Sequence, residues 1–215
     1  MSEKSAAVAH QFETIEQQRE AATLGMWVFL ATEVLFFGGL FMGYTYTRWS
    51  YPYTFEQASH HLDATIGGIN TAVLLLSSLM MALAVKSAQL GKRKPLVTYL
   101  LLTALLGMVF LGFKALEYHE DYVDHIVPGI RGFNFEGGSP RHAELFFWIY
   151  FAMTGLHAIH VTAGIIVITV MAVLAWRRSF SSEHFMSVEV TGLYWHFVDI
   201  VWVFLFPLLY LAGHR

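Results

Sequence analysis

The stretch LVTYLLLTALLGMVFLGFKAL, from Leu96 to Leu116, contains a single charged residue, Lys114. A helix of this length, at about 1.5 Å per residue, covers the ~30 Å hydrocarbon core of a bilayer. Four more stretches have the same character, which predicts five membrane spans at about residues 23–47, 66–90, 96–116, 145–176 and 190–212. We therefore expect an all-α polytopic bundle of five transmembrane helices. It forms one membrane domain over residues 23–215, preceded by a cytoplasmic segment of residues 1–22.

The composition supports a membrane protein and excludes several other classes. Hydrophobic residues make up 56% of the chain and charged residues 13%, against about 25% charged in soluble domains. A net charge of −3 leaves no basic face for a nucleic acid. The sequence has no cysteine, which excludes disulfides, thiolate metal sites and cysteine nucleophiles. No nucleophile, phosphate-loop or zinc motif is present, so neither a catalytic residue nor a bound metal is expected.

The basic residues between the spans predict the orientation of the chain. An N-terminus in the cytoplasm places eight Lys and Arg on the inner side and four on the outer side, as the positive-inside rule requires. The first 22 residues are acidic, unlike the basic start of a signal peptide. We expect residues 14–22 to form a short cytoplasmic helix before the first span, and the C-terminus to lie outside.

Glu33 lies about 15 Å deep in the first span, counted from its inner end. A carboxyl in hydrocarbon costs several kcal/mol unless it has a partner. One interpretation is a protonated carboxyl that hydrogen-bonds a neighbouring helix. The other is a proton-handling or lipid-contacting site, and the two are compatible. Asp199 in the fifth span and His160 in the fourth are expected at a similar depth, so we predict that Glu33 pairs with a histidine of the fourth span.

The fourth and fifth spans carry a set of polar residues that suggests two alternatives. His157 and His160 share one helical face, and Glu189, His196 and Asp199 share another. His160 and His196 are candidate axial ligands of a haem between facing helices. Bulky neighbours argue against a macrocycle there. The alternative is a structural buried polar network, with His196 and Asp199 as a hydrogen-bonded pair.

Other polar residues inside the spans have simpler interpretations. Lys114 and Glu117 lie one turn apart near the outer end of the third span. We expect a local ion pair with the lysine reaching out to the membrane surface. Asn70, Ser77 and Ser78 in the second span are expected to hydrogen-bond neighbouring helices and not to bind a ligand.

The inner loop after the fourth span begins with Arg177 and Arg178. Two arginines at an inner membrane surface suit lipid phosphates. Plain positive-inside topology explains them equally well without a specific lipid.

Several of these segments together resemble one family, subunit III of the haem–copper terminal oxidases. The segment YWHFVDIVW at residues 194–202 resembles its last-helix signature. TGLHAIHV at 154–161, followed by Gly164, is similar to its penultimate helix, and TEVLFF at 32–37 to its Glu-bearing helix. The resemblance extends over about residues 20–212 and includes Asn70-Thr71, Ser77-Ser78 and Glu117-Tyr118. Longer members have seven spans, and this chain resembles a short form that begins at the third.

The resemblance implies roles for individual residues. Glu33 matches the membrane glutamate of the family, which implies lipid contact or support of proton uptake. Arg178 and His184 match its headgroup-binding inner loop, which implies phospholipid there. The resemblance implies a structural role for five further residues, which match positions in the spans of the family: His157, His160, Glu189, His196 and Asp199.

The resemblance also implies a non-catalytic protein. Such a subunit holds no haem or copper, which lie in partner subunits. Its partners are the catalytic subunit I, subunit II and further small subunits, in a bacterial cytoplasmic (inner) membrane. The expected complex is a cytochrome c oxidase that couples oxygen reduction to proton pumping, in which this chain binds lipid and sustains proton uptake. The alternatives are a quinol oxidase, a nitric-oxide-reductase-associated relative or, in another class, a free-standing b-type membrane cytochrome.

Overall fold

The computed structural model describes residues 12–129, 133, 135, 139–177 and 185–211. Within them the chain forms six helices: α1 (Ile15–Ser50), α2 (Pro52–Ser59), α3 (Ala64–Gln89), α4 (Arg93–Val123), α5 (Pro140–Arg177) and α6 (Phe185–Tyr210). All but the short α2 are long and apolar enough to cross a membrane. The predicted all-α fold with five spans is therefore confirmed.

The helices extend beyond most of the predicted spans, and α1 and α2 show two further differences. Thr14 caps α1 by accepting a hydrogen bond from the Gln17 backbone N–H, and the helix then continues without a break to Ser50. The short helix expected over residues 14–22 is thus the first part of α1. Pro52 begins α2, a helix that the sequence did not predict because its eight residues are too few to show an apolar pattern.

A capping side chain begins α3, and a glycine turn precedes α4. The Asp63 side chain accepts hydrogen bonds from the backbone N–H groups of Thr65 (2.7 Å) and Ile66 (3.2 Å), as an N-cap does. Gly91 has a φ of +66°, which glycine adopts without strain, and its turn reverses the chain between α3 and α4. Arg93 then donates from Nε to the Ala175 carbonyl (2.8 Å) and ties the start of α4 to the end of α5.

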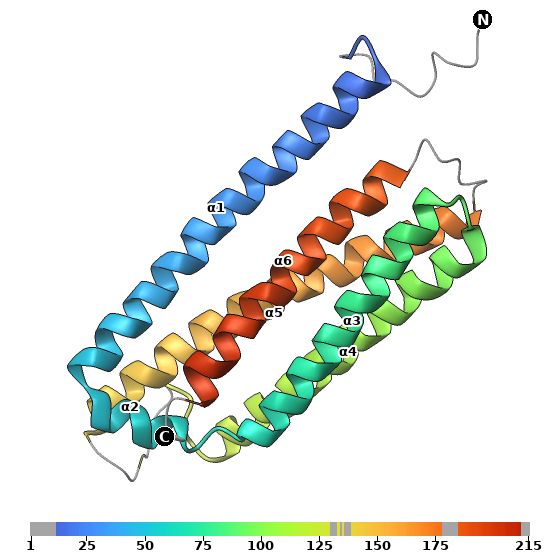
Figure 1. The fold of residues 1–215 in the computed structure, drawn as a ribbon. Coiled ribbons are helices and arrows are strands. Elements are labelled where there is room, and N and C mark those ends of the chain that lie inside the picture. The colour runs from blue at the N-terminus through green and yellow to red at the C-terminus, as the bar shows by residue number, and fades with distance from the viewer. Residues whose placement is uncertain (1–11, 130–132, 134, 136–138, 178–184, 212–215) are drawn as a thin grey trace, which may run out of the picture.

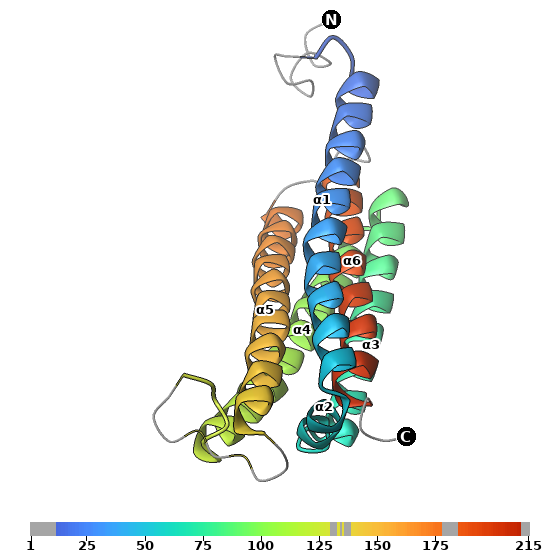
Figure 2. The ribbon, with the colours of Figure 1, turned by 90° about the vertical axis from the view of Figure 1, so that its left-hand side faces the viewer.

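Four helices form the body of the bundle and α1 lies outside it. α3 packs on α4 and α6, and α5 packs on α4 and α6, whereas α1 packs less closely, mainly on α6 and α5. Figures 1 and 2 show the first turns of α1 projecting beyond the other helices, and α1 beginning at the opposite end of the bundle from the end of α6. The buried residues of α1 are Leu30, Phe37 and Tyr44, two turns apart on one face.

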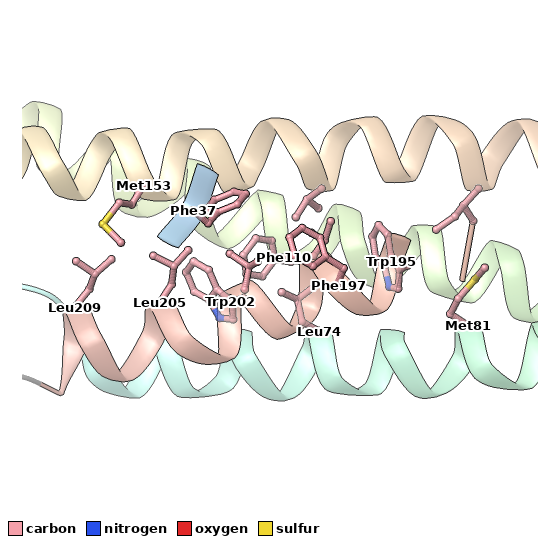
Figure 3. Close-up of a cluster of buried hydrophobic side chains, with 14 of the residues drawn as sticks. Phe37, Leu74, Met81, Phe110, Met153, Trp195, Phe197, Trp202, Leu205 and Leu209 are labelled. Atoms are coloured by element: carbon pink, nitrogen blue, oxygen red, sulfur yellow. The ribbon is translucent and has the colours of Figure 1, made fainter. Parts of the chain in front are cut away.

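The core is centred on α6, whose Trp195 and Trp202 are fully buried (Figure 3). Trp195 fits between two glycines on facing helices. A Cβ at Gly107 of α4 or at Gly164 of α5 would lie 2.8 Å from its ring. Small residues of this kind allow helices to approach closely in membranes.

Candidate functional site: two polar clusters within the helices

The Glu33 carboxyl on α1 contacts His160 on α5. Glu33 Oε2 lies 3.1 Å from His160 Nε2, and each side chain is 18% exposed. The Phe37 ring packs edge-on against the imidazole, with 5.3 Å between the ring centroids. Tyr194 of α6 donates to the His160 carbonyl (3.0 Å). The pairing predicted for Glu33 with a histidine of the fourth span is therefore confirmed.

The protonation of this pair follows from the second nitrogen of the imidazole. His160 Nδ1 lies 2.8 Å from the Leu156 carbonyl, which can only accept, so Nδ1 carries a hydrogen. The Glu33–His160 hydrogen bond then needs one more proton, on either the carboxyl or Nε2. In both cases the pair is neutral as a unit and holds one proton that can move between two atoms.

His196 and Asp199 on α6 do not form the pair that the sequence suggested. His196 Nδ1 hydrogen-bonds Ser78 Oγ at 2.6 Å, and Asp199 Oδ1 is buried without a hydrogen-bond partner. The prediction was wrong because α6 packs directly on α3, which brings the Ser78 hydroxyl to the imidazole. The haem interpretation also does not fit, since both ring nitrogens of His160 are hydrogen-bonded to other protein atoms.

The other residues of the expected polar network lie apart from one another. His157 is buried between Phe110 and Trp202, and neither of its ring nitrogens has a hydrogen-bond partner. Glu189, expected to be buried, is partly exposed and pairs with Arg19 of α1 at 3.8 Å. This differs from the expectation because α1 is longer than predicted and reaches the start of α6.

The polar residues of the second span behave as predicted. Asn70 Nδ2 donates to the Phe110 carbonyl (3.4 Å), and Ser77 Oγ donates to the Thr103 carbonyl (3.0 Å). With the Ser78–His196 contact, these bonds tie α3 to α4 and α6, so their role as interhelical partners is confirmed. Arg178 and His184 lie outside the described residues. Within those residues, no group of three or more His, Cys, Asp or Glu side chains is placed to hold a metal ion.

A second polar cluster, which the sequence indicated only in part, surrounds Lys114. Its ion pair with Glu117 is confirmed at 3.0 Å between Nζ and Oε2. The lysine does not reach out to the membrane surface, because the residue is only 3% exposed. Its Nζ also donates to the hydroxyls of Tyr150 on α5 (3.0 Å) and Tyr210 on α6 (2.8 Å).

The charged groups of this Lys114 cluster find their hydrogen-bond partners within the cluster. The hydroxyls of Tyr150 (2.7 Å) and Tyr210 both donate to Glu117 Oε1. The ammonium thus uses its three protons, and both carboxylate oxygens have partners. The rings of Tyr118, Tyr150, Trp202 and Tyr210 lie with their centroids 5.0–5.5 Å from Nζ, within cation–π range. The spacing of Lys114 and Glu117 was visible in the sequence, but the tyrosines come from two other helices.

These features define a polytopic membrane helix bundle with two interior polar clusters, one partly open and one closed. The sequence pattern of the family described as cytochrome c oxidase subunit III matches residues 6–214, and the chain belongs to this family. A relative named "Probable quinol oxidase subunit 3", from Staphylococcus saprophyticus, is 30% identical over 210 residues, covering 96% of this chain and 98% of the relative.

Two further relatives match over almost their whole length. "Cytochrome bo(3) ubiquinol oxidase subunit 3" of Pseudomonas aeruginosa is 28% identical over 216 residues, covering 96% of this chain and 92% of the relative. "Probable quinol oxidase subunit 3" of Staphylococcus aureus strain USA300 is 28% identical over 210 residues, with 96% and 98% covered. The matches therefore cover almost the whole of this chain and of each relative.

Proposed function

We propose that this chain is the non-catalytic subunit III of a respiratory haem–copper oxidase whose electron donor is a quinol. The observation that carries the proposal is the near full-length match to relatives named quinol oxidase subunit 3. These names favour the quinol alternative over the cytochrome c oxidase that the resemblance first suggested. The haem and copper belong to partner subunits, foremost the catalytic subunit I, with subunit II and smaller subunits beside it.

The Glu33–His160 pair is the part of the chain best suited to support proton uptake by the partner. It is partly exposed and holds one proton shared between two atoms. It can therefore pass that proton on and take up another, with a single negative charge on the pair in between. We propose that the pair keeps a proton available beside the catalytic subunit during repeated turnover. Its role is one of positioning, because Glu33 has no contact with a reacting atom in this chain.

The complex is proposed to lie in a bacterial cytoplasmic membrane with the N-terminus of this chain inside. The bacterial relatives and the excess of Lys and Arg on the side of the N-terminus support this location. On that side, Arg178 and His184 are proposed to contact a phospholipid headgroup. The single membrane domain is proposed to begin at residue 23, where the apolar part of the chain begins.

Purification of the native complex through a tag on this chain tests the proposal. We expect a haem–copper catalytic subunit to copurify, and the complex to oxidise quinol with oxygen but not reduced cytochrome c. A complex that oxidises cytochrome c and not quinol would overturn the assignment of the donor. Absence of any haem–copper subunit, together with a haem spectrum in the isolated chain, would overturn the family role and restore the b-type cytochrome.

A further inference from the structure

Two tryptophans of α6, Trp195 and Trp202, are fully buried seven residues apart but differ in their hydrogen bonding. Trp202 Nε1 donates to the Thr71 hydroxyl of α3 at 3.0 Å. The described residues give the Trp195 Nε1 no hydrogen-bond partner. An indole N–H can only donate, and burying it without an acceptor costs free energy. Trp195 therefore lacks the acceptor that Trp202 has.

The packing of α3 against α6 explains this difference. The two helices pack side by side and run in opposite directions (Figure 1). Ser78 follows Thr71 by seven residues and Trp195 precedes Trp202 by seven, so Ser78 lies at the level of Trp195. The Ser78 hydroxyl, however, lies 2.6 Å from the Nδ1 of His196. The hydroxyl that corresponds to Thr71 thus bonds a different side chain.

The indole nitrogen of Trp195 is directed towards α3. A Cβ at Gly164 of α5 would lie 2.8 Å from Cε3 and Cζ3 of the ring, and these atoms lie across an indole from Nε1. Figure 3 shows the nitrogens of Trp195 and Trp202 on the same side of α6, the side of α3. The N–H of Trp195 therefore lies at the interface between these two helices.

An acceptor in the same situation lies one turn further along α6. Asp199 is four residues from Trp195, which places both on one side of the helix. The residue is 6% exposed, and its Oδ1 has no hydrogen-bond partner among the described residues. The carboxyl also interacts with the Ser78 hydroxyl of α3. A buried donor and a buried acceptor thus lie one turn apart at the α3–α6 interface.

The two groups define the ligand that can join them. It must accept from an N–H group and donate to a carboxyl oxygen, which neither a metal cation nor an anion does. It must also be small, because Leu74 and Met81, one turn on either side of Ser78, are fully buried. Buried water molecules make about two to four hydrogen bonds to protein groups of this kind. A single water molecule meets these conditions.

We propose that the α3–α6 interface binds one water molecule, held by Trp195 Nε1, Asp199 Oδ1 and the Ser78 hydroxyl. This water gives Trp195 the acceptor that Thr71 gives Trp202, and it joins α6 to α3 within the membrane-spanning part of the bundle. The site goes beyond the proposed function, because it belongs to the interior of this chain and needs no partner subunit.

X-ray hydroxyl-radical labelling of the purified native complex, read by tandem mass spectrometry, tests the site. The radicals form from water, so a buried side chain is oxidised where a water molecule lies beside it. We expect Trp195 to be oxidised several-fold faster than Trp202, which is equally buried on the same helix and has a protein acceptor. Equally slow oxidation of the two tryptophans would overturn the proposal.

Substitutions of Asp199 test its part in holding the water. Asp199→Leu removes both carboxyl oxygens at a similar side-chain size and should lower the oxidation of Trp195 to the level of Trp202. Asp199→Asn keeps an acceptor oxygen and should retain the labelling of the wild type. Asp124→Leu makes the same change at a half-exposed position of the outer end and is the matched control. Unchanged oxidation of Trp195 in Asp199→Leu would overturn the role of Asp199.

A structure of the complex at a resolution that shows ordered water gives a second measurement. We expect a water peak within about 3.2 Å of both Trp195 Nε1 and Asp199 Oδ1. A direct hydrogen bond between these two side chains, or a partner group in this place, would overturn the site. Both measurements use whichever assembly purifies through this chain. A haem–copper complex without the water overturns only the site, and the water in a chain without a haem–copper partner overturns only the proposed function.

Discussion

Each of the two polar clusters pairs a glutamate with a basic side chain, but the clusters differ in exposure and in the number of other hydrogen-bond partners. Glu33 and His160 meet where α1 packs loosely on α5, and each side chain is 18% exposed. Lys114 and Glu117 lie between α4, α5 and α6, with side chains 4% and 14% exposed. The first pair shares one proton between two atoms and has few other partners. The second is enclosed by two tyrosine hydroxyls that satisfy both charges.

The difference leads to opposite expectations for substitutions in the two clusters. A closed network holds helices together but cannot release a charge without leaving another unpaired. We expect the open pair to contribute less to stability, and its partial exposure allows its proton to exchange. We expect substitutions in the Lys114 cluster to affect unfolding, and substitutions in the Glu33–His160 pair to affect turnover.

The largest effect is expected for Lys114→Met. This change leaves the Glu117 carboxylate buried without its counter-charge, which costs about 3–5 kcal/mol of unfolding free energy. Chemical unfolding in detergent micelles, followed by far-UV circular dichroism, measures the loss. The exposed Lys94→Met is the matched control and should cost little. A loss below about 1 kcal/mol for Lys114→Met would contradict the closed cluster.

Removal of one tyrosine hydroxyl should have a smaller effect. Tyr210→Phe deletes a group that accepts from Lys114 and donates to Glu117, and hydrogen bonds to charged groups contribute about 1.5–3 kcal/mol. Tyr46→Phe, at an exposed position of α1, is the control and should unfold like the wild type. Equal stability of the two variants would show that the tyrosine is not part of the network.

Asp63, an exposed residue outside both clusters, allows the stability contributed by a surface polar contact to be compared with that of the buried ones. Asp63→Ala removes the N-cap of α3 and should cost about 1 kcal/mol. The backbone N–H groups of Ile66 and Thr65 lower the pKa of Asp63. Its contribution to stability is therefore complete above the unfolded pKa of about 3.9 and is lost as the pH falls through the lower folded pKa.

Unfolding of the wild type and of Asp63→Asn across acidic pH checks this sign. Asparagine retains a capping oxygen but does not titrate, so the stability of the variant relative to the wild type should rise as the pH falls. A parallel pH dependence of the two proteins would refute the role of the Asp63 carboxylate.

The features best predicted from the sequence are those that depend on the apolar composition of a segment or on the depth of a residue in the membrane. Five spans follow from long apolar stretches, and the contact between Glu33 and His160 follows from their similar depth. The direction of the Lys114 side chain could not be predicted in this way, because a lysine near the end of a span can reach either out to the membrane surface or into the bundle. The choice depends on Tyr150 and Tyr210, which only the packing of α5 and α6 brings to it. Ser78 likewise reaches His196 because α3 packs on α6, which no spacing within α6 can reveal.

Glu33→Gln tests the central claim most directly, that the open pair serves turnover and not stability. Glutamine keeps the size and a hydrogen bond to His160 but cannot exchange a proton as a carboxyl does. In the purified complex we predict a nearly unchanged initial rate of oxygen consumption and a several-fold lower number of turnovers before inactivation. The exposed Glu56→Gln should match the wild type. Unchanged endurance of Glu33→Gln in an intact complex would contradict the account.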